Sequence, residues 1–158
     1  TASAAYNYWA NQRILKWLAN HPAELLHTKL ESSYPTIHLT MKHITGAEIF
    51  WLNIIQGKPV EFKQVVEILE QTALADYGAV AEQFSKFVES LSDEELSNDC
   101  TLNTSWAKAV RPTYEFIQHC MNHSSYHRGQ IITLGRTLGM QNPPNTDFNT
   151  YVIPITTL

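Results

Sequence analysis

The sequence lacks the features of fibrous, membrane-spanning and nucleic-acid-binding chains. It has 6 glycines and 7 prolines in 158 residues and no apolar run of about 18 residues, which argues against collagen and a membrane-spanning helix. No basic-then-apolar stretch opens the chain, so we expect no secretory leader. Eleven Lys and Arg against fifteen Asp and Glu give a formal charge of -4. We therefore expect neither a nucleic-acid partner nor a membrane partner.

Cysteine is also scarce. Cys100 and Cys120 could pair, but two cysteines make no disulfide framework, and neither lies in a Cys-x-x-Cys motif. This favours a reducing, cytoplasmic location. Hydrophobic residues, in contrast, make up 44% of the chain, with seven His, four Trp and seven Tyr among the 158 residues. That composition can fill one hydrophobic core, so we predict a single domain over residues 1–158.

Apolar residues recur at helical spacing in four long segments, which predicts an all-α fold, a four-helix bundle. The predicted helices cover residues 4–20, 37–56, 72–91 and about 112–138. Thr36 would cap the second helix and Gly57 would end it, while Pro112 would lie near the first position of the fourth. Residues 62–69 could form a helical turn or a connector. The pattern of residues 98–110 predicts a short irregular or extended segment before the last long helix. Residues 141–153 are predicted to form a non-helical tail.

Three histidines follow one another at four-residue steps in the predicted fourth helix: His119, His123 and His127. Each step advances about 400° and rises about 6 Å, so neighbours lie on one face. The outer two are about 12 Å apart, whereas a metal needs its nitrogen ligands at about 2.0 to 2.1 Å. At most one adjacent pair can therefore bind one ion, and the spacing leaves open which pair it is.

A pair of histidines is an incomplete site, so a further ligand has to come from another helix. His43 is the leading candidate because apolar residues share its face of the predicted second helix. His21, His27 and His38 have the positions of ordinary surface or boundary histidines. Buried histidines are also common as hydrogen-bonded core residues. The residues alone are therefore compatible with a cluster that binds no metal.

Several segments resemble the DinB family of metal-dependent bundle proteins, and the resemblance covers nearly the whole chain. The most specific is Asn122-His123-Ser124-Ser125-Tyr126-His127-Arg128-Gly129-Gln130-Ile131. The others are Tyr8-Trp9-Ala10-Asn11-Gln12-Arg13-Ile14-Leu15, His43-Ile44 with Ala47-Glu48 and Trp51, and the tail from Gly139 to Tyr151. The resemblance implies a bundle, commonly dimeric, whose metal ligands are His43, His123 and His127. His119 would then be a packing or outer residue one turn away.

This ligand set implies a chemistry. Three neutral imidazoles would leave a divalent Zn or Ni ion its full charge, able to lower the pKa of bound water towards about 7 and to polarise a substrate. The nearest ligand nitrogens would lie within about 4 Å of one another. We expect a metal-dependent enzyme, either a hydrolase or a thiol-dependent transferase, acting on a small molecule. The alternative is a non-catalytic metal-binding or small-molecule-binding dimeric bundle.

Other residues favour structural roles. Glu48 lies about 140° round the helix from His43, so we expect it to pair with a polar neighbour instead of the ion. Arg128 is expected to make a structural contact, and Gly129 to allow a close helix approach. We expect Trp9, Trp17 and Trp51 to fill the core, and Tyr126 to lie near the metal site.

Apolar residues of the first two helices exceed what a bundle core needs, which predicts a homodimer that buries them. They are Tyr6, Trp9, Trp17, Ile49, Leu52 and Ile55.

Overall fold

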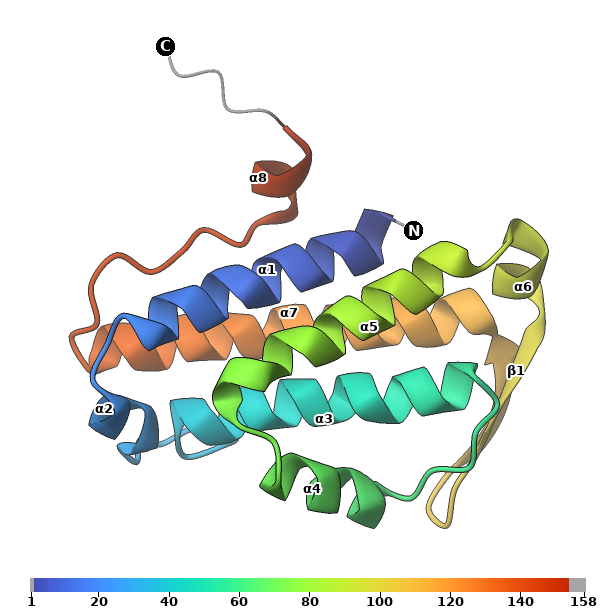
Figure 1. Cartoon of the computed structure of the whole chain (residues 1–158), viewed down its shortest axis with the longest axis horizontal. Helices are drawn as coiled ribbons and strands as arrows, with labels where there is room; N and C mark the ends of the chain where they lie inside the picture. The colour runs from blue at the N-terminus through green and yellow to red at the C-terminus, as the bar shows by residue number, and fades with distance from the viewer. Residues whose placement is uncertain (1, 154–158) are drawn as a thin grey trace.

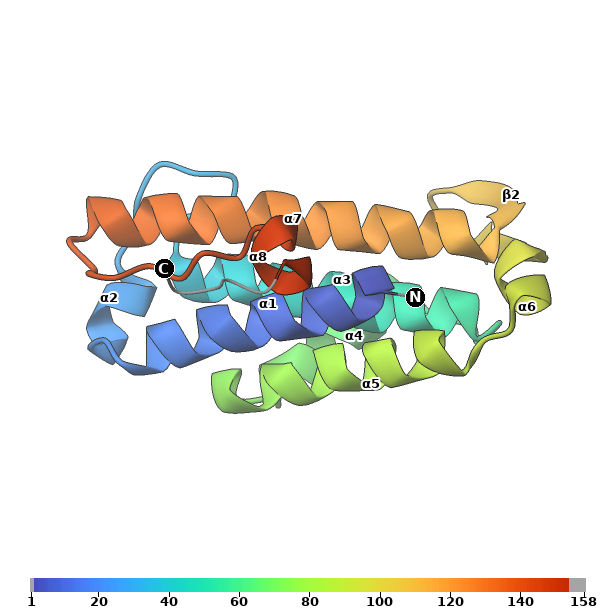
Figure 2. The same cartoon turned by 90° about the horizontal axis from the view of Figure 1, so that it is seen from above.

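The computed structural model describes residues 2–153 and is built around four long helices that run side by side (Figures 1 and 2). They are α1 (Ala2–Ala19), α3 (Ile37–Ile55), α5 (Tyr77–Ser90) and α7 (Thr113–Thr137). Helices α1 and α3 each pack against both α5 and α7, so α1 lies diagonally opposite α3. The predicted four-helix bundle is therefore confirmed.

Short elements connect and flank the bundle. They are α2 (Ala23–His27), α4 (Phe62–Glu70), the 3-10 turn η1 (Leu74–Asp76), α6 (Asp93–Ser97), β1 (Asp99–Asn103), β2 (Lys108–Pro112) and α8 (Phe148–Val152). The two strands pair antiparallel, with Asp99 opposite Pro112 and Asn103 opposite Lys108. This hairpin is the extended segment predicted before the last long helix, and it lies at one end of the bundle beside α6 (Figure 1).

The ends of α3 follow the predicted local rules. The Thr36 side chain accepts a hydrogen bond from the Leu39 backbone amide at 3.1 Å, which satisfies a donor of the first turn. After the helix, Gly57 adopts a φ of 66°, a left-handed conformation that favours glycine, and its amide donates to the Ile54 carbonyl at 2.9 Å. Both signals fix the span of the helix that carries His43.

Three boundaries differ from the prediction. The third long helix begins at Tyr77 and not near residue 72, because the chain turns after α4 and forms a separate 3-10 turn first. Pro112 is the last residue of β2 and precedes α7 instead of lying inside it. The tail contains α8, whose start is capped by Asp147 through a 3.0 Å bond from the Asn149 amide.

Only one of three tryptophans predicted to fill the core does so. Trp17 is buried, whereas Trp9 and Trp51 are half-buried. The indole of Trp51 stacks on Phe116 with ring centroids 5.2 Å apart. Trp9 lies against Tyr151, at 5.4 Å between ring centroids.

The apolar surplus that predicted a dimer is largely covered within the chain. Trp17 and Leu52 are buried, and α8 packs on the outer face of α1, where Tyr6 contacts Phe148 at 5.1 Å between ring centroids. The segment predicted to be a non-helical tail thus supplies part of the cover, over Tyr6 and Trp9 (Figure 1). The homodimer was predicted because these apolar side chains would otherwise be exposed, and that reason is wrong where the chain itself covers them. The homodimer stays a prediction.

Gly129 does not mediate a close helix approach. A Cβ atom at Gly129 would meet nothing within 4 Å, whereas one at Gly135 would collide with the indole of Trp17. The close contact between α1 and α7 therefore depends on Gly135, two turns further along the helix.

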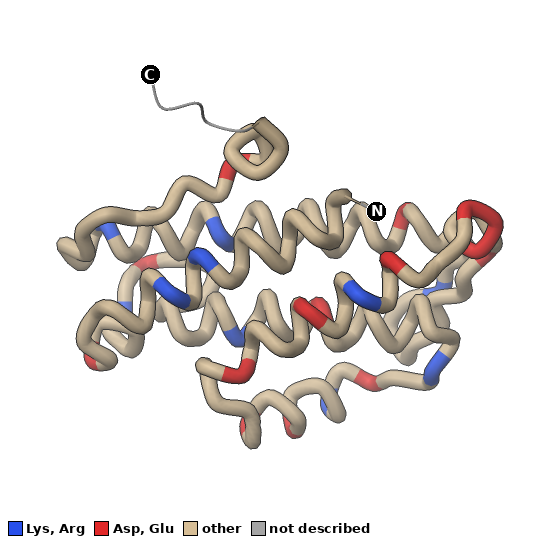
Figure 3. Tube along the Cα trace, turned by 45° about the horizontal axis from the view of Figure 1, so that its top comes forward, with Lys and Arg blue, Asp and Glu red and all other residues tan. Residues whose placement is uncertain are grey.

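Charged residues of both signs are spread along the molecule, with a group of acidic residues at α6 (Figure 3). Among residues 2–153, no helix is both long and apolar enough to cross a membrane.

Candidate metal centre

Helices α3 and α7 bring three histidines from distant parts of the sequence to one point. His43 Nε2 lies 2.9 Å from His123 Nε2, and one nitrogen from each of His43, His123 and His127 falls within 4.8 Å of the others. The distance between His43 and His123 is within the expected spacing of about 4 Å, and for the three nitrogens together the distances reach no further than 4.8 Å. His127 is buried and the other two rings are half-buried.

The three rings are inclined to one another and surround a common point. The angle between ring planes is 61° for His43 and His123, 64° for His123 and His127, and 82° for His43 and His127. Ring centroids lie between 4.5 and 4.7 Å apart in all three pairs. Because the planes are not parallel, the nitrogen lone pairs can converge from different directions, as ligation of one ion requires.

Two of the rings are held through the nitrogen that faces away from this point. His43 Nδ1 lies 2.8 Å from the hydroxyl of Tyr34, and His127 Nδ1 lies 2.7 Å from Oε1 of Gln130. An amide oxygen only accepts, so His127 donates from Nδ1, which in a neutral ring leaves the lone pair on Nε2. His123 Nδ1 is buried and has no hydrogen-bond partner among the described residues.

Burial and mutual proximity keep two imidazoles neutral. Burial, followed by the positive charge that His127 can carry, lowers the pKa of His43 to about 4. Burial also lowers the pKa of His123 to about 4, with smaller effects from His43, His127 and His119. Both rings are thus unprotonated near pH 7, which is the form that binds a metal.

His119, one turn before His123, is exposed and lies outside the cluster. Its ring meets the indole of Trp51 edge to face at 4.9 Å, and its centroid is 6.0 Å from that of His123. This is the packing position predicted for it. Tyr126 is exposed but lies against His127, at 4.9 Å between ring centroids.

Glu48 and Arg128 belong to a separate, largely buried network, as their predicted structural roles require. Asn7 and Asn11 donate to Oε1 of Glu48 at 2.6 and 2.7 Å, and Nη1 of Arg128 donates to the amide oxygens of the same two asparagines at 2.6 and 2.9 Å. Nη2 donates to Ser125 Oγ at 2.8 Å. The network therefore joins α1, α3 and α7 at the centre of the bundle.

The carboxyl group of Glu48 is 0% exposed, and this burial raises its pKa to about 7. The hydrogen bond from Asn7, the charge of Arg128 and the hydrogen bond from Asn11 oppose the shift.

Sequence reasoning did not single out Asn7 and Asn11. Both are 1% exposed, on one helical face with the buried Ala4, Ile14 and Leu18. The signal was their spacing, since residues 4, 7, 11, 14 and 18 recur at three- and four-residue steps.

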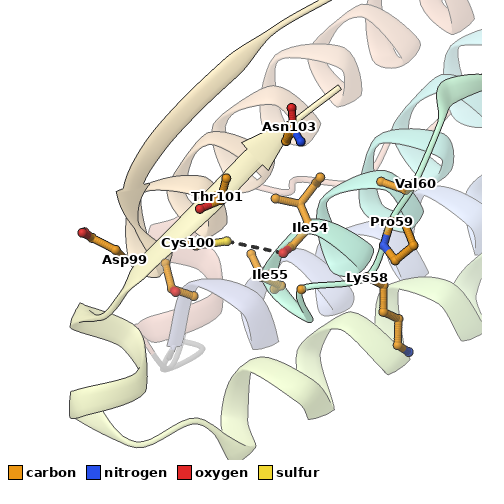
Figure 4. A pocket seen from close by; sticks show the side chains of 11 residues that line it. Ile54, Ile55, Lys58, Pro59, Val60, Asp99, Cys100, Thr101 and Asn103 are labelled. Carbon is orange, nitrogen blue, oxygen red and sulfur yellow. Dashed lines mark hydrogen bonds between the residues drawn. The ribbon is translucent and has the colours of Figure 1, made fainter. Parts of the chain in front are cut away.

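Neither cysteine has the surroundings of a reactive or ligating thiol. Cys100 and Cys120 are free and buried, and burial raises the pKa of both thiols. Cys100 lines a pocket at the hairpin end of the bundle, where its thiol lies 3.4 Å from the Ile54 carbonyl oxygen (Figure 4).

Known proteins resemble this chain in sequence and in fold. Residues 1–154 match the DinB family. The chain therefore belongs to the DinB family. The protein DinB of Bacillus subtilis strain 168 is 27% identical over 157 residues, covering 93% of this chain and 90% of that protein.

The crystal structure of a DinB-like protein, YjoA of Bacillus subtilis, superposes with a TM-score of 0.69. The superposition covers 93% of this chain and 99% of that one at 17% sequence identity, so this likeness concerns the fold alone.

Proposed function

We propose that His43, His123 and His127 bind one divalent metal ion, Zn or Ni, and that this member of the DinB family is a metal-dependent enzyme. The observation that carries the proposal is the number of ligands. Among residues 2–153, the cluster of mutually close His, Cys, Asp and Glu donors has three members. Three protein ligands are typical of catalytic zinc sites, which keep a position open, whereas structural sites are closed by a fourth ligand.

The chemistry of the donors fits such an ion. Nε2 of His127 is free to ligate because its Nδ1 donates to Gln130, and Nε2 of His43 points at Nε2 of His123. Neutral imidazole suits Zn and Ni. When bound, the ion would supply Lewis acidity to a small-molecule substrate, in a hydrolysis or a thiol-dependent group transfer.

A second function is a non-catalytic bundle that binds a metal or a small molecule. The half-buried position of His43 and His123 favours the enzyme, because a substrate can then reach the cluster.

As part of the proposal, two copies of the chain form a homodimer, which light scattering would detect as twice the 18.0 kDa chain mass.

The deciding experiment is metal analysis of protein purified without an affinity tag. We expect about one Zn or Ni ion per chain. X-ray absorption at the metal edge should report three imidazole ligands and one further light atom from solvent. A protein that contains no metal and takes none up from added Zn or Ni would overturn the proposal.

A further inference from the structure

The connector between α2 and α3 contacts the histidine cluster directly. Residues 28–36 are irregular, and a backbone hydrogen bond of 2.8 Å from the Leu30 amide to the Pro35 carbonyl holds the two ends of the loop together. Between them, Ser33 accepts a bond from Gln130 Nε2 at 3.2 Å, and Tyr34 lies against His43. This connector is part of the site, although it lies outside the long helices.

Tyr34 contacts two of the three histidines. Its ring stacks on that of His43 with centroids 4.3 Å apart and 27° between the planes, and it meets His127 edge to face at 5.7 Å. Its hydroxyl is 2.8 Å from His43 Nδ1. The ring restricts where the His43 imidazole can move, while the hydroxyl fixes its rotation.

The hydroxyl also influences which nitrogen of His43 carries the proton. A neutral imidazole has one N–H and one lone pair, so a proton on Nδ1 leaves the lone pair on Nε2, the nitrogen that faces His123. The Tyr34 oxygen can accept from that Nδ1–H. Histidines that ligate metals usually donate their other N–H to such a partner, which fixes the ring and the tautomer.

We propose that Tyr34 is a positioning residue for metal binding, which holds His43 in its ligating tautomer and couples residues 28–36 to the occupancy of the site. The inference depends on the proposed metal site. Gln130 plays the equivalent part for His127, but it lies three residues away on the same helix and stays near its partner whatever the connector does. The hydrogen bond at Nδ1 of His43, in contrast, exists only while the connector is in place.

The coupling has to work in both directions, because binding free energies are linked. If an ordered connector favours metal binding, a bound metal must favour the ordered connector to the same degree. Metal loading should therefore slow amide exchange in residues 28–36 more than in the hairpin at the other end of the bundle.

The test compares Tyr34→Phe with Tyr114→Phe. Both variants keep the aromatic ring, and the exposed Tyr114 bonds Glu115 instead of a residue of the histidine cluster. Competition with a chromogenic chelator measures Zn affinity, and hydrogen exchange with and without Zn measures the connector. We expect Tyr34→Phe to weaken Zn binding by about 10- to 100-fold and Tyr114→Phe by less than about 3-fold.

The outcomes separate the two proposals. A wild-type protein that binds no Zn overturns the metal site itself. Wild-type binding with an unchanged affinity in Tyr34→Phe overturns the role of Tyr34 and leaves the metal site standing. If Tyr34→Phe does not fold, wild-type exchange decides: protection of residues 28–36 by Zn supports the coupling, and its absence overturns it.

Discussion

Two polar clusters lie next to each other on α7 and differ in how their hydrogen-bonding groups are used. His123 and His127 point toward α3 and His43, while Arg128, the residue after His127, joins the buried network with Glu48. In the network, both Nη1 bonds of Arg128 end on asparagine oxygens whose amide groups donate to Glu48. In the histidine cluster, Nε2 of His43 and Nε2 of His123 lie 2.9 Å apart with at most one proton between them in a hydrogen bond, and Nδ1 of His123 has no partner among the described residues.

This difference separates a structural cluster from a binding site. The network links α1, α3 and α7 through hydrogen bonds between oppositely charged and amide side chains, and it stabilises the packing of these helices, although Oε2 of Glu48 and Nε of Arg128 have no partner among the described residues. In the histidine cluster, the neutral rings of His43 and His123 meet at nitrogens that are the ordinary ligands of a metal ion. The same helix therefore carries one polar cluster held by side chains of opposite charge and one whose nitrogens fit a bound cation.

The largest expected effect is the loss of metal from ligand variants. His123→Ala or His127→Ala should reduce the metal content from about one per chain to near zero, because two imidazoles make an incomplete site. His119→Ala, in which the packing histidine is removed, should retain the metal. Elemental analysis of the three purified variants measures this. Metal loss in His119→Ala together with retention in His127→Ala would move the site one turn along α7.

Removal of the buried guanidinium should destabilise the fold without removing the ligands. Arg128→Met leaves the buried Glu48 without its nearby positive charge and the oxygens of Asn7 and Asn11 without their donor, at a cost on the order of 3–5 kcal/mol in the free energy of unfolding. The matched control is Arg111→Met, which breaks an exposed bond to Glu115 and should cost less than about 1 kcal/mol. Urea unfolding in the presence of a chelator compares them, and equal losses would show that the network adds little stability.

The same network predicts a pH dependence. The pKa of Glu48 is raised to about 7 in the folded protein from an ordinary value of 4.5, so folding favours the protonated form. The resulting stabilisation is complete below pH 4.5 and is lost as pH rises through about 7.

Glu48→Gln keeps an oxygen that can accept from Asn7 and Asn11 but does not titrate. Relative to this variant, the wild type should lose on the order of 2–3 kcal/mol of unfolding free energy between pH 4.5 and pH 8. Urea unfolding at both pH values measures it in chelator-treated protein. A constant difference would mean that the carboxyl group titrates normally.

The smallest effects concern the glycines that flank the clusters on α7. Gly129→Ala should stabilise the protein by up to about 1 kcal/mol, because alanine favours helix and its methyl group meets open space. Gly135→Ala should destabilise it by about 1–3 kcal/mol through the collision with Trp17. Thermal unfolding of the pair measures both, and a stabilised Gly135→Ala would show that the α1–α7 contact is loose.

Much of the fold follows from short-range patterns. The periodicity of apolar residues predicts the four long helices, and capping residues such as Thr36 and Gly57 mark the ends of α3. The predicted start of the third long helix, α5, is wrong because local signals do not show where the chain has to turn between packed helices. Helix α8 was missed even though Asp147 is a good capping residue, since a helix of five residues depends on its packing against α1.

The site divides in the same way. Spacing puts His119, His123 and His127 on one face, because helical geometry is local, and it limits one ion to an adjacent pair. The apolar face around His43 makes it the leading candidate for a third ligand. Its proximity to His123, the burial of Asn7 and Asn11, and the contact of Tyr34 with His43 all depend on how α1, α3, α7 and a connector come together. A polar side chain can be buried only where another segment supplies its partner, and that partner is absent from its own stretch of sequence.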